Sequence, residues 1–417
     1  MRVALVGPTS PLQGGIVAHT EGLRVALEAR GHSVERVGIQ RLFPRWISRG
    51  RVCEVRGVAL EHAIDALAPT TWRRAVESIS ADVVVAQHWT PILVPALTAV
   101  FAFARASRRV LVCHNFTPHE YVPGARRLVE SLLRRADAAI FHSRHVETAA
   151  LARIEKGHLE SRVVPMPMLI PPSTAARRPV ELAVEDRADM PLIALVGHLR
   201  RYKGLDSLAE ACRLVDPELR FHLVIAGEPI GTTWDLSRLA RLARAGARVT
   251  VVRRYLDDAE LIWLLQSAAA IVLPYSRASQ SGVLPLALRL SRHIVLSDAG
   301  GLAEQVGEGG APVSIVPARD SRRLAFAIAG AVCAAREGDA RAVRQGRETG
   351  SGEGDYASGW RPLVAAVESV GRTRETGSNS AQPAASLDVA STGDEPPSRA
   401  WYHAGRLAFA KPEMPTT

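Results

Sequence analysis

The sequence contains few cysteines, and they stand far apart. Four cysteines in 417 residues form neither a C-x-x-C pair nor a spacing typical of zinc ligands. Their scarcity argues against a disulfide framework and against a zinc site built from cysteines. A reducing, cytoplasmic location is therefore the prediction that best suits this composition.

Aromatic residues are also scarce, at 5% of the chain, and no helix-turn-helix, zinc-finger or base-stacking motif is present. Nucleic acid is therefore not predicted as a partner, although the formal net charge is +10.

Most of the excess positive charge lies in residues 1–185, where 24 Lys and Arg stand against 16 Asp and Glu, a difference of +8. A basic half favours an anionic partner such as a lipid surface or a phosphorylated acceptor. An arginine-rich proteome is the alternative explanation.

No uninterrupted apolar run is long enough to predict a membrane span. Residues 83–104 contain no Asp, Glu, Lys or Arg, but Gln87, His88 and two prolines interrupt them, which favours strand, loop and helix in turn. The opening residues 1–10 (MRVALVGPTS) hold too short an apolar stretch for a signal peptide and predict a first strand.

What the sequence does contain is an alternation of short apolar runs with amphipathic stretches, which is typical of parallel α/β domains. It begins with a strand at 3–6, a helix at 16–30 and a strand at 33–37, and it restarts at 192–196 after a proline-rich and then charged linker. At 417 residues the chain exceeds one ordinary core. We therefore predict an α/β protein of two doubly wound, Rossmann-like domains that face each other across a cleft.

The linker and the composition of the C-terminal region set the predicted domain boundaries. An N-terminal domain is expected over residues 1–185 and a C-terminal domain over 186–358. A terminal helix over 359–372 would cross back to the N-terminal domain. Residues 373–417 are rich in Ser, Thr, Pro, Ala and Gly, which predicts a mostly disordered tail because such a segment buries little apolar surface.

The loop after the first strand carries a glycine pair, Gly14-Gly15, at the mouth of the first helix. It lacks the G-x-G-x-x-G spacing of a dinucleotide site, so a nicotinamide enzyme is disfavoured. The glycines nevertheless allow a ligand to approach the helix opening, where unpaired N–H groups favour anions. A tight turn without function is the alternative.

Two further loops are expected at the same edge of the first sheet. His114 follows the strand at 110–113, and His88 with Trp89 follows the strand at 83–86, so these residues would lie where parallel sheets bind ligands. Histidine can accept a proton or hydrogen-bond a sugar hydroxyl, and tryptophan packs well on a sugar ring. A buried structural histidine and a core tryptophan are the competing interpretations.

Two cations and two glycines surround the first helix opening of the second domain. Arg200 and Lys203 lie between Gly197 and Gly204, which suits a diphosphate because arginine binds two oxygens while lysine adds a point charge. A solvated basic loop is the alternative. Later in this domain Ser281-Gly282-Val283 opens another helix and favours a phosphate in the same way.

Together, five ordered motifs resemble those of the retaining glycosyltransferases of family 4, which have the GT-B fold. The motifs are Gly14-Gly15, residues 113–120 (CHNFTPHE), residues 200–204 (RRYKG), Arg254-Tyr255 and residues 280–283 (QSGV). The resemblance covers most of both predicted domains. It implies an acceptor-side role for the N-terminal domain and a nucleotide-sugar donor role for the C-terminal domain.

The resemblance also implies a role for each matching residue. Arg200 and Lys203 would hold the donor diphosphate and His114 would contact the transferred sugar near its anomeric centre, which makes these three the expected catalytic residues. The expected donor-binding residues are Gly14, Gly15, Gly227, Glu228, Tyr255, Gln280, Ser281, Gly282, Val283 and Glu304, and the acceptor-side residues are His88, Trp89, His119 and Glu120. Such family members need no bound metal or cofactor, so none is expected beside the nucleotide sugar, which is a co-substrate.

The sequence departs from the family in its donor loop. Two glutamates that the family usually places eight positions apart align with Ser279 and Ala287, neither of which can act as a carboxylate. Glu304 or Glu228 would then substitute for them. His198 stands where the wider family often has an arginine.

We therefore expect a retaining glycosyltransferase that moves a hexose from a nucleotide diphosphate sugar to a hydroxyl acceptor in polysaccharide or glycoconjugate synthesis. A polyprenyl-linked acceptor and peripheral attachment at the inner face of the membrane fit the basic half and the helix expected at 125–136, whose leucines oppose its arginines. Packing of that helix on the sheet is the alternative.

Two other functions stay open. One is a catalytically degenerate protein that binds nucleotide sugars without transfer, which the missing glutamates motivate. The other is a sugar-nucleotide epimerase of the same fold, which would need acid and base carboxylates and for which the first domain offers Glu120.

Overall fold

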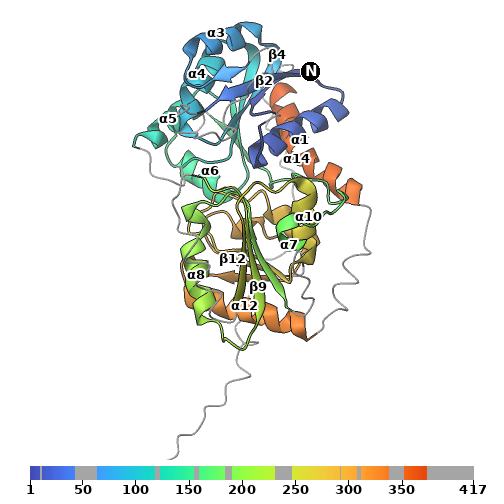
Figure 1. The fold of residues 1–417 in the computed structure, drawn as a ribbon. Coiled ribbons are helices and arrows are strands. Elements are labelled where there is room, and N and C mark those ends of the chain that lie inside the picture. Colours follow the sequence, from blue (N-terminus) through green and yellow to red (C-terminus); the bar gives the residue numbers. More distant parts are fainter. Residues whose placement is uncertain are drawn as a thin grey trace, which may run out of the picture. The chain divides into compact units, whose positions relative to one another are not determined.

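The chain forms two parallel β-sheets with helices alongside each (Figure 1). This computed structural model describes residues 1–9, 12–42, 63–117, 123–154, 159–183, 190–230, 247–291, 293–307, 311–337 and 352–372. Every strand pairing within the described residues is parallel. The predicted pair of doubly wound α/β domains is therefore confirmed.

The first sheet has seven strands in the order β3-β2-β1-β4-β5-β6-β7. The strand order reverses beside β1, because the chain places β2 on one side of it and β4 on the other. The strands are β1 (Arg2–Gly7), β2 (Ser33–Arg41), β3 (Ile64–Asp65), β4 (Ser80–His88), β5 (Arg105–Cys113), β6 (Ala138–Phe141) and β7 (Glu160–Val163). The helices are α1 (Gly15–Ala29), α3 (Pro69–Ser78), η1 (Pro91–Leu93), α4 (Val94–Phe103), α5 (Ala125–Leu133) and α6 (Arg144–Leu151).

The second sheet repeats this plan with six strands in the order β10-β9-β8-β11-β12-β13, and its order reverses beside β8. The strands are β8 (Leu192–Val196), β9 (Phe221–Ala226), β10 (Ala247–Val252), β11 (Ala270–Leu273), β12 (Ile294–Ser297) and β13 (Val313–Val316). The helices are α7 (Val180–Ala183), η2 (Arg201–Lys203), α8 (Leu205–Leu214), α10 (Asp258–Ser267), α11 (Leu284–Leu290), η4 (Ala303–Gln305) and α12 (Ser321–Arg336).

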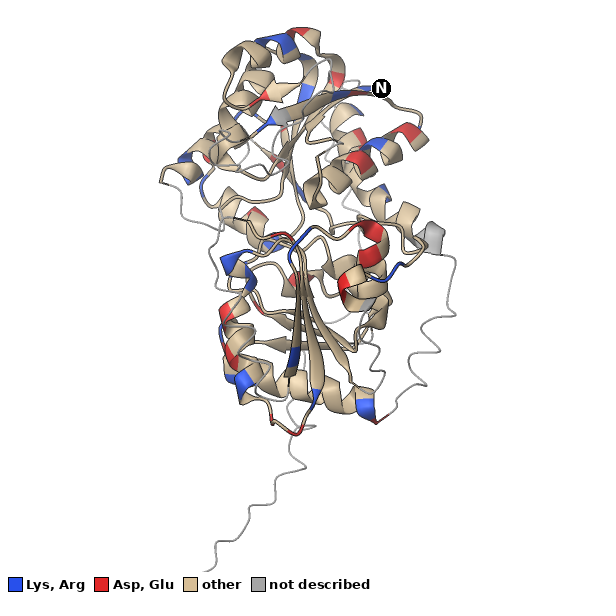
Figure 2. Ribbon diagram, in the orientation of Figure 1, with Lys and Arg blue, Asp and Glu red and all other residues tan. Residues whose placement is uncertain are grey.

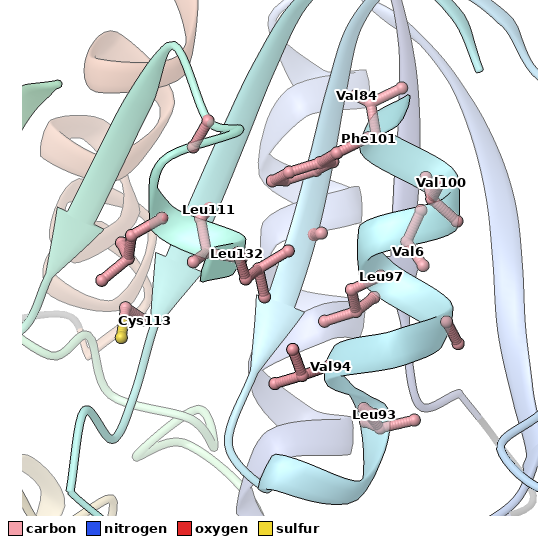
Figure 3. Packing of buried hydrophobic residues seen from close by; sticks show 14 of the residues in the cluster. Val6, Val84, Leu93, Val94, Leu97, Val100, Phe101, Leu111, Cys113 and Leu132 are labelled. Carbon is pink, nitrogen blue, oxygen red and sulfur yellow. The ribbon is translucent and has the colours of Figure 1, made fainter. Parts of the chain in front are cut away.

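The central strands are short apolar runs because helices cover both of their faces. Successive residues of β4 point to opposite sides: Val84 joins the cluster that contains Leu97 and Phe101 of α4 (Figure 3), whereas Val83 joins Leu23 of α1. A charge on either face would lie in a dry core, where an unpaired charge is strongly unfavourable. The charge-free stretch at 83–104 forms the predicted strand and helix, and the predicted loop between them contains the short helix η1.

The last described helix, α14 (Gly352–Arg372), packs on the first sheet. Its Trp360 is 2% exposed and lies so close to α1 that a Cβ on Gly22 would come within 2.1 Å of the ring. Glu368 accepts a hydrogen bond from His32 at 2.8 Å, which joins α14 to the segment after α1. The helix begins at Gly352, ahead of the predicted residue 359, although its early glycines have low helix propensity.

Helix α5, the candidate membrane helix, packs on the sheet. Val129, Leu132 and Leu133 are fully buried in the cluster that α4 also joins, and Leu128 keeps 43% of its surface exposed. Packing on the sheet, the alternative interpretation of α5, is therefore correct.

Basic and acidic residues are interspersed along the helices of both domains (Figure 2). Among the described helices, none is long and apolar enough to cross a membrane.

Candidate functional site

The strand order places the candidate site at the carboxyl ends of the strands. In open parallel sheets ligands bind where the order reverses, because the loops on either side diverge there. In the first sheet these loops follow β1 and β4, and in the second sheet they follow β8 and β11. They include most of the positions singled out by the sequence motifs.

The glycine pair of the first loop approaches the second domain closely. Gly14 has a φ of 130°, which favours glycine, and a Cβ there would lie 3.4 Å from Nε2 of His198. A Cβ on Gly15 would lie 3.5 Å from Leu169 of the segment that joins the domains. The pair thus lets the side chains of His198 and Leu169 approach the opening of α1 closely, and the binding of a ligand there stays a prediction.

His114 is 1% exposed and lies between two side-chain amides. Its Nε2 is 2.6 Å from Oε1 of Gln87, and its Nδ1 is 3.4 Å from Nε2 of Gln280. One neutral tautomer satisfies both contacts, with Nε2–H donating and Nδ1 accepting. Burial lowers the pKa of His114 well below its usual value, and the neighbouring histidines act in the same direction. His114 is therefore a neutral hydrogen-bonding group at this edge.

The other acceptor-side residues have different surroundings. His88 is 1% exposed, burial lowers its pKa to about 4, and its carbonyl accepts the backbone N–H of His114 at 2.9 Å. Trp89 packs against the core cluster of the first domain and is only partly buried. His88 thus fixes the backbone of His114 by a buried hydrogen bond, while the Trp89 side chain stays partly exposed to solvent. His119 and Glu120 lie outside the described residues.

Two further histidines join His114, and the sequence motifs did not reveal them. The ring of His19 in α1 lies 4.8 Å from that of His114 between centroids, and the ring of His142 lies 5.2 Å from it. His142 directly follows β6, so the rule that pointed to His114 after β5 would have found it. His19 follows Gly15 by about one helical turn.

In the second domain, glycines allow the loops after β8, β9 and β11 to pack without space between them. Gly204 has a φ of 75°, and a Cβ there would lie 1.8 Å from the carbonyl oxygen of Pro274. A Cβ on Gly227 would lie 2.0 Å from the carbonyl oxygen of Gly197. No side chain fits at either position, so the glycines fix where the cationic loop lies.

Lys203 is 9% exposed and is held by an aromatic side chain. Its Nζ donates a hydrogen bond to the hydroxyl of Tyr275 at 2.5 Å and lies 3.9 Å from the centre of that ring. Burial lowers the pKa of the ammonium, and nearby Arg200 lowers it further. Burial also raises the pKa of Tyr275 to about 12, so the phenol stays neutral. Within the described residues, no carboxylate pairs with Lys203.

The surroundings of Lys203 are electropositive. His198 follows β8, and its pKa is lowered to about 4 by burial first and by Lys203 and Arg200 next. Arg200 stands at the N-cap of η2, which ends at Lys203. Charges that repel a proton from His198 will attract an anion to the same place.

The Arg254-Tyr255 turn combines a structural residue with one near the glycine pair. Arg254 pairs with Glu260 at 2.6 Å and with Glu181 of α7 at 2.7 Å, which holds the interdomain segment to α10. The pKa of Tyr255 is raised mainly by burial, and its hydroxyl lies at the backbone of Gly14. Tyr255 therefore lies at the predicted donor edge, while Arg254 supports it.

The QSGV segment is held by a residue that its motif does not include. Gln305 accepts the N–H of Ser281 at 2.5 Å and donates to the Ser281 carbonyl at 3.1 Å. A Cβ on Gly282 would lie 2.8 Å from Leu169, and Val283 is the N-cap of α11. With Gln280 beside His114, this segment connects the two predicted halves of the site.

The two glutamates considered as substitutes have different environments. Glu304 accepts the backbone N–H groups of Arg144 at 2.6 Å and His145 at 3.0 Å, so both its oxygens cap α6 of the first domain. A helix N-terminus attracts a carboxylate, so these contacts give Glu304 a capping role, and its donor-binding role stays a prediction. Glu228 follows Gly227 and is partly buried, and its carbonyl accepts the N–H of Leu199.

The positions of the missing family glutamates are closed. Ser279 is 6% exposed, and its carbonyl accepts the hydroxyl of Ser143 at 3.1 Å. Ala287 is fully buried within α11. Neither residue carries a carboxylate, so neither position contributes one to a ligand.

A surface hollow on the second domain lies away from these loops. It is lined by the exposed Phe326 and by Arg322 of α12, and by His293, which precedes β12. The loops of the candidate site follow the carboxyl ends of the strands, whereas His293 stands at the amino end of β12. The hollow therefore does not belong to the candidate site.

The second domain matches a known family. Residues 190–333 match the family model described as "Glycosyl transferases group 1". This range contains the cationic loop, the Arg254-Tyr255 turn and the QSGV segment.

Two curated relatives match parts of the chain. The chain is 33% identical over 118 residues to a GDP-mannose:glycolipid 4-beta-D-mannosyltransferase of Xanthomonas campestris, covering 27% of this chain and 33% of that protein. It is 37% identical over 177 residues to a glycogen synthase of Mycobacterium tuberculosis, covering 41% of this chain and 40% of that protein. The chain thus matches well under half the length of either relative.

Solved structures share the fold over most of the chain. HepE of Anabaena, in complex with UDP and glucose, has a TM-score of 0.58 at 14% identity and covers 89% of this chain and 97% of its own. Sucrose-phosphate synthase of Thermosynechococcus elongatus has a TM-score of 0.59 at 18% identity, covering 89% and 96%. The catalytic domain of starch synthase IV of Arabidopsis thaliana, bound to ADP and acarbose, has a TM-score of 0.61 at 13% identity, covering 88% and 99%. The chain has the GT-B fold, with two Rossmann-like domains.

Proposed function

We propose that this protein is a glycosyltransferase that moves a hexose from a nucleotide diphosphate sugar to a hydroxyl acceptor. The observation that carries the proposal is the buried ammonium of Lys203, which has a phenol but no described carboxylate as its partner. A buried cation without a counter-ion is unfavourable, so this position strongly favours an anionic ligand. The family match over residues 190–333 supports a nucleotide sugar as that ligand.

The cationic loop suits a leaving diphosphate. When the bond to the sugar breaks, negative charge grows on the departing phosphate, and fixed positive charge close to it lowers the barrier. Lys203 is fixed by Tyr275, and Arg200 adds a second charge whose effect reaches Lys203. Neither group requires a metal ion for this role.

We propose that transfer proceeds with retention of the anomeric configuration. The acceptor hydroxyl would attack from the face that the diphosphate leaves, and its proton would pass late to a donor phosphate oxygen. His114, neutral and hydrogen-bonded by two amides, would orient the sugar. In the described residues the two family glutamates are absent, which supports a mechanism without a carboxylate nucleophile.

We further propose a lipid-linked acceptor in polysaccharide or glycoconjugate synthesis. The name of the Xanthomonas relative specifies a glycolipid acceptor, and the excess charge of +8 in residues 1–185 fits an anionic membrane surface. Because α5 packs on the sheet, surface charge is the only support for membrane attachment. Flotation with anionic and neutral liposomes at low and high salt tests it, and equal recovery with both lipids would rule out electrostatic attachment.

Calorimetric titration with UDP-, GDP-, ADP- and dTDP-sugars is the first test of the transferase proposal. We expect one nucleotide class to bind selectively. Incubation of that donor with hydroxyl acceptors, including polyprenyl-linked sugars, should then yield a glycoside whose anomeric configuration is read by NMR. An inverted product would contradict the retaining mechanism and would make His114 the base to test.

A binding protein without transfer is the second candidate, because buried Ser279 and Ala287 replace the carboxylates of the family. It predicts selective donor binding with neither hydrolysis nor transfer across the acceptor panel. Absence of binding to every nucleotide sugar would contradict both candidates. The epimerase alternative has less support, since Glu120, its candidate residue in the first domain, lies outside the described residues.

A further inference from the structure

The first domain contains a buried cluster of three histidines, of which the proposed transfer uses only one. His19 comes from α1, His114 follows β5 and His142 follows β6, and one ring nitrogen from each lies within 4.8 Å of the other two. All three side chains are at most 3% exposed. Histidines from three separate elements thus converge on one point beneath the surface.

The three rings differ in their hydrogen bonds, because both nitrogens of His114 contact the amides of Gln87 and Gln280, whereas three nitrogens of the other two rings have no partner among the described residues. The three nitrogens that make no hydrogen bond to the described part of the chain are Nδ1 and Nε2 of His19, and Nε2 of His142. Nδ1 of His142 is 2.9 Å from the carbonyl of Val164, so Nδ1 carries the proton and Nε2 keeps its lone pair. Buried acceptors without partners are unfavourable, and such groups call for a water or an ion.

We propose that His19, His114 and His142 form a binding site for a divalent transition-metal ion of the Zn²⁺ or Co²⁺ type. Three imidazole nitrogens with an open fourth position are a common zinc ligand set, whereas Mg²⁺ and Ca²⁺ require oxygen ligands. Nitrogens around a tetrahedral zinc ion lie about 3.4 Å apart, as follows from zinc–nitrogen bonds of about 2.1 Å. Side-chain rotations that draw the nitrogens in from the present spacing would complete the site.

The surroundings of the cluster match those of a metal site. The Val164 carbonyl orients His142, and the Gln87 amide lies beside both His114 and His19. Groups of this kind fix the tautomer and direction of a ligating histidine. Trp360 of α14 covers the cluster, with its ring 5.4 Å from that of His19 between centroids. Gly22 makes room for this tryptophan.

An ion at this site would differ from a metal that accompanies a diphosphate. It would join α1 to the ends of β5 and β6 through nitrogen ligands, in a domain that lacks Arg200 and Lys203. Since His114 also belongs to the proposed sugar-binding edge, occupancy would fix its ring or withdraw its lone pair from the sugar. Metal binding itself is independent of the transferase activity proposed above.

The test is direct metal binding to the full-length chain, purified without a histidine tag and freed of metal with a chelator. Co²⁺ titration is followed by visible absorption and Zn²⁺ competition, and bound metal is counted by mass spectrometry. We expect one tightly bound ion per chain, the visible spectrum of cobalt with nitrogen ligands, and a higher melting temperature with Zn²⁺. Absence of a saturable cobalt spectrum and of any shift in melting temperature would overturn the proposal.

Two single variants, His19→Gln and His142→Gln, identify the site, and His222→Gln is the matched control. His222 is a partly buried histidine of the second domain, hydrogen-bonded to Thr250. Loss of one ligand should weaken cobalt binding by more than about 100-fold, since even supporting groups around a metal contribute 10- to 100-fold. The control should bind as the wild type does. Circular dichroism confirms the fold, and wild-type affinity in both cluster variants would disprove the assignment.

Discussion

The two sheets present their ligand edges through the same strand order but with different chemistry. In the first domain the carboxyl ends of β4 and β5 hold buried, neutral groups, among them Gln87 and His88 of β4 and His114 after β5. In the second domain the loop after β8 holds Arg200 and Lys203. The topology fixes where each edge lies, and the loop residues fix what it can bind.

The difference in charge indicates a division of labour. Sugar hydroxyls are uncharged and are recognised by aligned donors and acceptors, which neutral histidines and amides supply. Diphosphates are anions, and positive charge in a partly dry site attracts them far more strongly than it would in water. In the proposed transferase, the first edge would bind the sugar and the second would bind the leaving group.

The largest expected effect comes from removing the charge of the second edge. Lys203→Met should reduce transfer by about 100- to 1,000-fold, the usual loss when one preorganised donor to a developing anion is removed. Steady-state kinetics with the selected donor measures it. Arg201→Ala, which removes an exposed cation two residues away, is the matched control and should change the rate by less than about 3-fold. If both variants lower the rate equally, Lys203 contributes only as part of the general positive charge of the surface.

The second prediction concerns the close packing that fixes the cationic loop. Gly204→Ala should lower the free energy of unfolding by about 3 kcal/mol, because the new Cβ meets the Pro274 carbonyl and the backbone needs a positive φ. Gly31→Ala has a similar φ of 79° but open space around its Cβ, so it isolates the backbone strain at about 1 kcal/mol. Urea unfolding measures both, and equal losses would show that the contact with Pro274 has no effect.

The third prediction uses pH at the second edge. His198 has a folded-state pKa of about 4, below its unfolded value, so the unfolded chain binds more protons between pH 6.5 and 4. Its contribution to stability is fully present above pH 6.5 and is lost as the pH falls through 4. The full shift corresponds to about 3 kcal/mol. Urea unfolding of His198→Gln across this range should give a flatter pH profile, and an unchanged slope would contradict the assignment.

The smallest effect is expected at the neutral edge. His114→Gln should lower kcat/KM by about 10-fold and leave nucleotide binding unchanged, because it removes uncharged hydrogen bonds to the sugar alone. Initial rates with the sugar nucleotide, together with calorimetry of the free nucleotide, separate the two effects. A loss of nucleotide affinity equal to that of Lys203→Met would remove the distinction between the edges.

The sequence was a good guide to the sheets because strand patterns are local. Apolar runs such as 83–86 and 192–196 mark strands buried on both faces, and the structure has β4 and β8 there. The start of α14 was less predictable, since glycines disfavour a helix that packing on α1 then stabilises. For α5 the pattern allowed either a membrane or the sheet, and only burial of Leu132 decided for the sheet.

The candidate site divides in the same way. Gly14, His114 and Lys203 could be found in the sequence because each follows a strand or opens a helix. Glu304 could not be placed, because a glutamate shows no sign in the sequence of the helix it caps in another domain. The hydroxyl of Tyr275 on Lys203 is likewise a contact between residues far apart in the chain.

By itself, the sequence determined the alternating strands and helices, the two-domain organisation and the residue types of the loops, because periodicity, glycine and charge act over a few residues. Tertiary structure decided which of these side chains meet. Lys203 reaches Tyr275, and His114 meets His142, because parallel strands bring their carboxyl ends to one edge, and the packing of α1 adds His19. The three histidines are neutral because burial lowers their pKa values, and no local sequence pattern measures burial.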